Sequence, residues 1–260
     1  MNTSGLDHYN IYSKYLNDIY GYDEKTLNNT EKVEEILKDI TQEWHLSEYY
    51  SILVENKIPT PYSEFVTIQN LFEHPEMIDA KITKFRNSQV FARTDSCSSK
   101  PSEPFYSAED IIISLKSSDR TNSLILDPNC ILVLREYITD ISDYYEFRCF
   151  VHDGKCRGIT SAQPINCDFK LTQTMLNNII SLINKIIFYT EYDMCTIDIA
   201  IHKYDINRDI LTIEINTPVW LCATSGLFDL LNPYDYDILL GSYKPDIVKY
   251  PVLKIDYNDD

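Results

Sequence analysis

Several features on which common classes of protein depend are scarce or missing in this sequence of 260 residues. Glycine occurs only 6 times, and no loop has the glycine pattern of a Walker motif or of a dinucleotide-binding turn. The 7 cysteines form no CxxC pair, which argues against a zinc ribbon or a disulfide framework and favours reduced, mostly buried thiols. The 5 histidines lack metal-ligand spacing, and no Ser/His/Asp or Cys/His order favours nucleophilic catalysis.

The chain also lacks an excess of positive charge and a long apolar segment. Its formal net charge of −17 disfavours a general affinity for nucleic-acid backbones. The longest apolar stretch, residues 179–189, is interrupted by Asn184 and Lys185, so we expect no membrane span. Hydrophobic residues make up 44% of the chain and aromatic residues 12%. This composition predicts a globular, soluble protein of the cytoplasm or nucleus.

Hydrophobic periodicity predicts alternating helices and strands through most of the chain. We expect helices over 31–44, 49–54, parts of 70–85, 107–118 and 171–186, and strands over 63–68, 89–93, 130–137, 146–151, 155–160, 197–201 and 211–215. The pair Asp153-Gly154 is a strong signal for a hairpin turn. We divide the chain into an N-terminal region (1–87), a core (88–232) and a C-terminal tail (233–260). The first 28 or so residues have no clear periodicity and are either a flexible extension or a loosely packed arm.

The most informative stretch runs from Cys195 to Thr217 and places three oxygen ligands on two short apolar strands. Glu214 and Asn216 are two residues apart, so they share one face of a strand. If the two strands pair as a hairpin near its symmetric register, Asp198 lies beside them. Two carboxylates and an amide oxygen suit Mg²⁺. An ordinary solvated strand face is the alternative interpretation.

Three basic residues are further candidates. Arg93 and Lys100 bracket a loop of small hydroxyl residues, which can hold phosphates through backbone N–H groups and two cations. A surface loop with two solvated cations is the alternative. Arg148 falls in the middle of a predicted strand, where an unpaired guanidinium is costly, so it requires an anion. Glu146 is a poor candidate for that anion, because residues two apart on a strand rarely form a bidentate pair.

Taken in order, these features resemble the ATP-grasp fold and, within it, the cell division cycle protein 123 family. The resemblance covers roughly residues 88 to 232, and its most specific pieces are KSSD (116–119) and EFRCFV (146–151). It also rests on VFAR (90–93), LVLR (132–135), Lys155, Gly158-Ile159, Asp198 and EIN (214–216). It implies an α+β fold in which two α/β lobes hold a nucleotide between antiparallel sheets. The family usually has Lys where this chain has Arg93. It usually has Asp-Phe-Asn-Pro-Phe where this chain has Glu-Ile-Asn-Thr-Pro at 214–218.

The resemblance implies ATP and Mg²⁺ as cofactors and assigns a role to each candidate. Arg93, Lys100 and the catalytic Arg148 would neutralise phosphates, and Asp198, Glu214 and Asn216 would hold the metal. A hinge for adenine would span 132–137, with the nucleotide contacts Leu132, Val133, Leu134 and Arg135.

Two activities and one inactive state are compatible with this resemblance. Compact ATP-grasp ligases of phages and large viruses imply transfer of a phosphoryl group to a small carboxylate, followed by attack of an amine. The cell division cycle protein 123 family implies an ATP-dependent assembly chaperone whose partner is a subunit of the translation initiation factor two complex. A structural relative that binds no nucleotide is the third interpretation. None of the three involves a nucleic acid or a membrane.

Overall fold

The computed structural model describes residues 14, 16–18, 21–40, 45–96, 98–99, 103–139, 141–162, 165–166, 168–205, 210–216, 252–254 and 257–258. They fall into two compact units. Unit 1 contains the described residues within 1–43, 145–201 and 214–260, and unit 2 those within 44–144 and 202–213. Residues 45–87, which the sequence analysis set apart from the core, therefore share a unit with the strands that follow them.

Two helices follow the described residues 14 and 16–18 in unit 1. They are α2 (Glu24–Leu27) and α3 (Thr30–Ile40). The Asp23 carboxylate accepts a hydrogen bond from the backbone N–H of Thr26 at 2.7 Å, which caps α2. The helix predicted from residue 31 is confirmed as α3.

Unit 2 is built on an antiparallel sheet of three strands in the order β1-β3-β2. These are β1 (Ser63–Thr67), β2 (Val90–Thr94) and the central β3 (Ile131–Glu136). The pairing places Phe65 and Arg93 on either side of Val133. Because side chains alternate along a strand, the neighbours of these residues point to the opposite face of the sheet.

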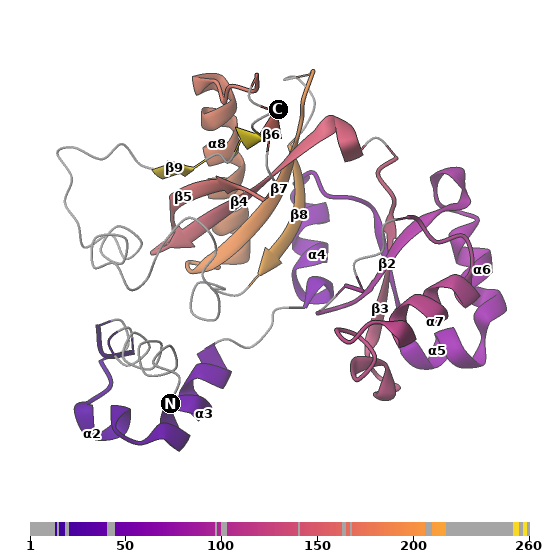
Figure 1. The fold of residues 1–260 in the computed structure, drawn as a ribbon, viewed down its shortest axis with the longest axis horizontal. Coiled ribbons are helices and arrows are strands. Elements are labelled where there is room, and N and C mark those ends of the chain that lie inside the picture. The colour runs from indigo at the N-terminus through magenta and orange to yellow at the C-terminus, as the bar shows by residue number, and fades with distance from the viewer. Residues whose placement is uncertain are drawn as a thin grey trace. The chain divides into compact units, whose positions relative to one another are not determined.

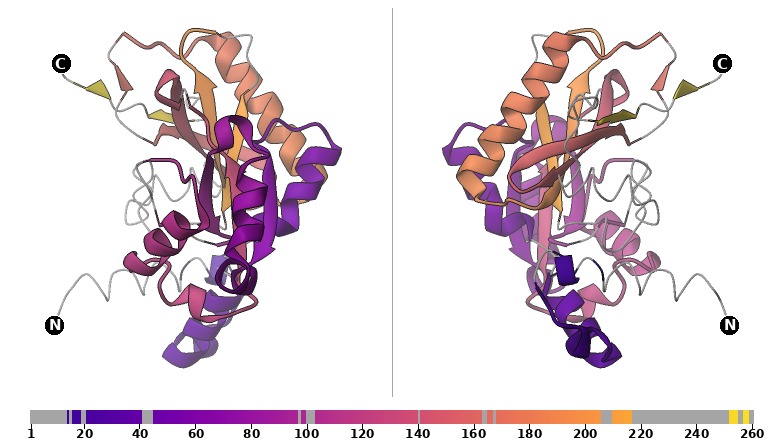
Figure 2. Two further views of the ribbon diagram at one scale, coloured as in Figure 1. Left: turned by 90° about the vertical axis from the view of Figure 1, so that its right-hand side faces the viewer. Right: turned by 90° about the vertical axis from the view of Figure 1, so that its left-hand side faces the viewer.

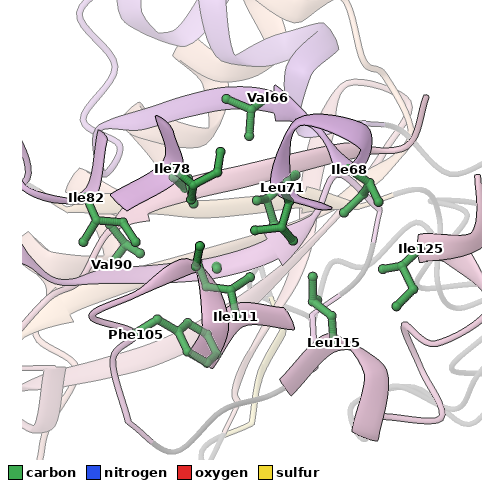
Figure 3. Close-up of a cluster of buried hydrophobic side chains, with 14 of the residues drawn as sticks. Val66, Ile68, Leu71, Ile78, Ile82, Val90, Phe105, Ile111, Leu115 and Ile125 are labelled. Atoms are coloured by element: carbon green, nitrogen blue, oxygen red, sulfur yellow. The ribbon is translucent and has the colours of Figure 1, made fainter. Parts of the chain in front are cut away.

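One face of this sheet carries the hydrophobic core of unit 2 (Figure 3). Three helices supply its other side: α5 (Ile68–Glu73), α6 (Pro75–Ile82) and α7 (Ala108–Ser117). Pro75 stands at the start of α6 and separates it from α5, as the sequence predicts. The core includes Leu71, Ile78 and Ile111 from the helices, together with Leu132 and Leu134 of β3.

The remaining elements of unit 2 are α4 (Leu46–Glu55) and the short 3-10 helices η1 (Arg86–Ser88), η2 (Leu124–Leu126) and η3 (Ile141–Asp143). The N-terminus of α4 is capped from a distant part of the sequence. The Asp95 carboxylate accepts hydrogen bonds from the Ser47 backbone N–H at 2.9 Å and from the Ser47 hydroxyl. The residue that follows β2 is thereby fixed to α4.

The larger sheet has five strands in the order β8-β7-β4-β5-β9. They are β4 (Tyr144–His152), β5 (Lys155–Ser161), β7 (Cys195–His202), β8 (Leu211–Asn216) and β9 (Val252–Lys254), and β6 (Ile165–Asn166) pairs separately with β10 (Tyr257–Asn258). Asp153 and Gly154 both have positive φ, at 52° and 61°, and join β4 to β5. The predicted hairpin is therefore confirmed.

Helix α8 (Gln173–Thr190) covers one face of the five-stranded sheet (Figures 1 and 2). Its buried side chains recur every three or four residues, as in Ile179, Ile183 and Ile186. Just before the helix, Phe169 packs against Phe147 of β4, with the rings tilted and their centroids 5.9 Å apart. Among the described helices, none has the length and apolar composition that a membrane span requires. The alternation along β4 directs Glu146 and Arg148 to the face opposite Phe147.

The last residue of β4, His152, is buried in the end of the hairpin with a relative exposure of 7%, and neither ring nitrogen makes a hydrogen bond. Burial lowers the pKa of His152, and the neighbouring positive charge of Arg157 on β5 lowers it further. The negative charges of Asp153 and Asp193 oppose this shift without reversing it. The folded protein therefore keeps this imidazole neutral at a pH where the unfolded chain already protonates its own.

We predict that the free energy of unfolding decreases as the pH falls below about 6.5, the ordinary pKa of histidine, because the unfolded chain then binds a proton that folded His152 does not. The variant His152→Leu should lose part of this dependence. The measurement is urea unfolding between pH 5 and 7.5. An unchanged slope in His152→Leu would contradict the prediction.

Candidate functional site

A polar cluster lies on the face of β4 opposite Phe147. At its centre, Arg148 of β4 donates to Asp198 of the adjacent strand β7 through two hydrogen bonds. The bond from Nε to Oδ1 and the bond from Nη2 to Oδ2 are both 2.8 Å long. The side chains are 32% and 17% exposed, so the pair is largely removed from water. Asp198 thus supplies the anion that Arg148 requires in the middle of a strand.

Strand β8 contributes the second half of the cluster. The Asn216 side-chain amide donates from Nδ2 to Asp198 Oδ2 at 3.4 Å. Glu214, two residues earlier, projects from the same face of the strand. The hydrogen bond to Asp198 raises the pKa of Arg148, and the negative charges of Asp198 and Glu214 add to this effect against the opposing effect of burial. The three candidate metal ligands therefore come together around one guanidinium.

Glu146 is a member of this cluster that the sequence analysis did not include among the site residues. Burial raises the pKa of its carboxyl group, and the nearby charge of Asp198 raises it further. The spacing of two residues from Arg148 was visible in the sequence, but the proximity to Asp198 depends on the pairing of β4 with β7. Glu146 is therefore a third carboxyl group of the cluster, in addition to Asp198 and Glu214.

The donor atoms of the cluster are suited to a hard divalent cation. Asp198 and Glu214 offer carboxylate oxygens and Asn216 an amide oxygen, the types of ligand that Mg²⁺ prefers. Within the described ranges, no three side chains of His, Cys, Asp or Glu are arranged as a metal site.

The other candidate residues belong to unit 2. Arg93 of β2 is buried and donates from Nε to the backbone carbonyl of Thr94 at 3.0 Å, so it is not the solvated surface cation of the alternative interpretation. It shares a face of the three-stranded sheet with Val133. Leu132 and Leu134 project into the hydrophobic core instead, so their side chains face the helices. Lys100 lies outside the described residues.

Comparison with protein-family models and with curated proteins finds no match. Among solved structures, C-terminally truncated Cdc123 from Schizosaccharomyces pombe matches with a TM-score of 0.63 and 18% identity over 82% of this chain and 95% of that chain. The structure of Cdc123 from the same organism matches with a TM-score of 0.59 and 18% identity, over 81% and 94% of the two chains. The D-alanine-D-alanine ligase from Coxiella burnetii gives 0.49 and 15%, over 76% and 56%.

The chain has an ATP-grasp fold. Its α+β class and its likeness to the structures of Cdc123 agree with the sequence-based prediction. At 18% identity this likeness extends to the fold alone.

Within this ATP-grasp fold, the start of β8 is anchored by Arg135 of β3. The buried guanidinium donates from Nη1 to the carbonyl of Ile213 at 2.5 Å, and from Nη2 to the carbonyl of Thr212 at 3.3 Å. Nη2 also donates to the Thr60 hydroxyl at 3.1 Å, and this hydroxyl in turn donates to the carbonyl of Thr212. The backbone N–H of Thr212 donates to the carbonyl of Pro59. The two residues that precede Glu214 are therefore fixed through their backbone.

We predict that Arg135→Met lowers the free energy of unfolding by about 2–4 kcal/mol, because the substitution removes the charged donor from the carbonyls of Ile213 and Thr212. Arg135→Lys should fall between the wild type and Arg135→Met, since an ammonium group lacks the planar fork that reaches several acceptors. Chemical denaturation provides the measurement. Arg120→Met, at an exposed arginine, should change the value by less than about 0.5 kcal/mol. Equal losses of unfolding free energy in Arg135→Met and Arg120→Met would show that the hydrogen bonds of Arg135 do not stabilise the fold.

Proposed function

We propose that this chain is an ATP- and Mg²⁺-binding ATP-grasp protein whose phosphate and metal contacts are made by the cluster around Arg148. The observation that carries the proposal is the bidentate pair of Arg148 and Asp198, adjoined by Asn216 and Glu214. Strands that only close a core have no need to bring together two carboxylates, an amide and a guanidinium. The fold supports the same interpretation.

The reaction we propose is ATP-dependent ligation of a carboxylate to an amine. A carboxylate oxygen of the substrate attacks the γ-phosphorus of ATP, and ADP leaves with the electrons of the broken P–O bond. The amine then attacks the carbonyl carbon of the acyl phosphate, loses a proton and displaces inorganic phosphate. Such phosphoryl transfer depends mainly on positioning and on neutralisation of charge.

The residues of unit 1 have distinct roles in this proposal. Arg148 binds phosphate oxygens, because its planar fork matches their geometry. Asp198, Glu214 and Asn216 hold the cation, and Mg²⁺ when bound neutralises the negative charge that builds up on the transferred phosphoryl group. Within unit 2, Arg93 remains a candidate phosphate contact, and Val133 and Arg135 remain candidates for the adenine hinge. The side chains of Leu132 and Leu134 would support that hinge from the core, and Lys100 stays a proposed phosphate contact.

A second candidate function is supported by the extent of the likeness to Cdc123, which covers 95% of the truncated Cdc123 chain. In this alternative the chain is an ATP-dependent assembly chaperone in the cytoplasm for a subunit of the translation initiation factor two complex. Both functions require ATP, and they differ in the acceptor.

We predict that calorimetry detects binding of ATP in the presence of Mg²⁺ with a Kd in the micromolar range. This Kd corresponds to a binding free energy of about −8 kcal/mol, which is more favourable than a loose anion contact provides. Glu214→Ala should remove the dependence of this binding on Mg²⁺, because it deletes one of two carboxylate ligands. Glu55→Gln, at an exposed carboxylate of α4, is the matched control and should bind like the wild type. Absence of ATP binding by the folded wild type would refute the proposed function.

Assays of the wild-type protein distinguish the two candidate functions. A ligase should release ADP and phosphate when offered carboxylates and amines without a protein partner. A chaperone should release neither under these conditions and should instead form an ATP-dependent complex with a purified subunit of the translation initiation factor two complex.

A further inference from the structure

The side chain that we assign to phosphate is bonded to the side chain that we assign to the metal. Both oxygens of Asp198 accept from Arg148, each at 2.8 Å. Bidentate pairs of this kind combine charge with fixed geometry and are the strongest hydrogen-bonded contacts between side chains. In this arrangement the guanidinium lies where it opposes the approach of a second positive charge to the same carboxylate.

A divalent cation on Asp198 would stand within a few ångströms of the guanidinium. At that separation two positive charges repel each other strongly in a partly buried site, where water screens them poorly. Asn216 also donates its amide N–H to Asp198, so the carboxylate receives three hydrogen bonds before any metal arrives. The closed pair therefore weakens the cation site that Asp198, Glu214 and Asn216 form.

A phosphate oxygen offers Arg148 an alternative partner. The pair uses Nε and Nη2, and the guanidinium has a further nitrogen, Nη1, with which to engage an incoming anion. Once phosphate draws the guanidinium away, its positive charge no longer opposes a cation at Asp198. The negative charge of the phosphate then adds to that of Glu214 and Asp198 and attracts the metal further.

We infer that Arg148 is a latch that makes cation binding at Asp198 conditional on a polyphosphate. This inference rests on the proposed function and adds an order of events to it. The free protein holds the latch closed and binds divalent cations weakly. A nucleotide opens the latch and brings the cation with it, so that metal and nucleotide bind together. The latch also gives Arg148 two successive partners, a carboxylate and then a phosphate.

The inference is tested by binding of Mn²⁺, a spectroscopically visible substitute for Mg²⁺, measured by electron paramagnetic resonance with and without β,γ-methylene ATP. In the wild type, the nucleotide analogue should tighten Mn²⁺ binding by at least about tenfold. Without the analogue, Arg148→Met should bind Mn²⁺ about tenfold more tightly than the wild type, because the competing charge is gone. The same variant should lose the enhancement by the analogue.

Two further variants serve as controls. Lys155→Met removes a positive charge from an exposed position on β5 in the same unit and should behave like the wild type. Arg148→Lys keeps the charge without the bidentate geometry, so its Mn²⁺ affinity should fall between those of the wild type and Arg148→Met. Because the lysine variant alters the strand least, it tests the latch even if Arg148→Met does not fold.

The possible outcomes separate the latch from the proposed function. If the wild type binds Mn²⁺ with the analogue, and Asp198→Asn abolishes this binding, the metal site stands. Equal or weaker binding of Mn²⁺ alone by both Arg148 variants then overturns the latch only. If no protein binds Mn²⁺ with or without the analogue, both the metal site and the latch are overturned.

Discussion

The ion pair between Arg148 and Asp198 is the constraint on which the larger sheet depends. Each residue occupies the middle of a strand, where a single buried charge would be strongly unfavourable. Their mutual neutralisation requires β4 and β7 to be neighbours in register, which the bidentate contact records.

Strand β8 links the polar cluster to unit 2. Its residues 211–213 belong to unit 2 and its residues 214–216 to unit 1. Arg135 and Thr60 fix the first half through the backbone, and the second half carries Glu214 and Asn216.

The sequence predicted the helices and strands in the described ranges well, because their patterns are local. The period of α8, the Asp153-Gly154 turn and the break at Pro75 each depend on residues within one element. The face of β3 was harder to predict, since four consecutive buried residues, 132–135, show no alternation of polarity. The role of Arg135 was also hidden, because its acceptors are backbone carbonyls 77 and 78 residues away in the chain.

The sequence by itself determined which residues could form an oxygen-ligand site, since strand periodicity places Glu214 beside Asn216 and a mid-strand Arg148 demands an anion. Only the tertiary structure decided that Asp198 is that anion and that Glu146 stands near it. The physical reason is that charge pairing across strands depends on which strands are neighbours and in what register, and both are properties of the whole sheet. Local patterns carry the chemistry of each residue, whereas the sheet determines its partner.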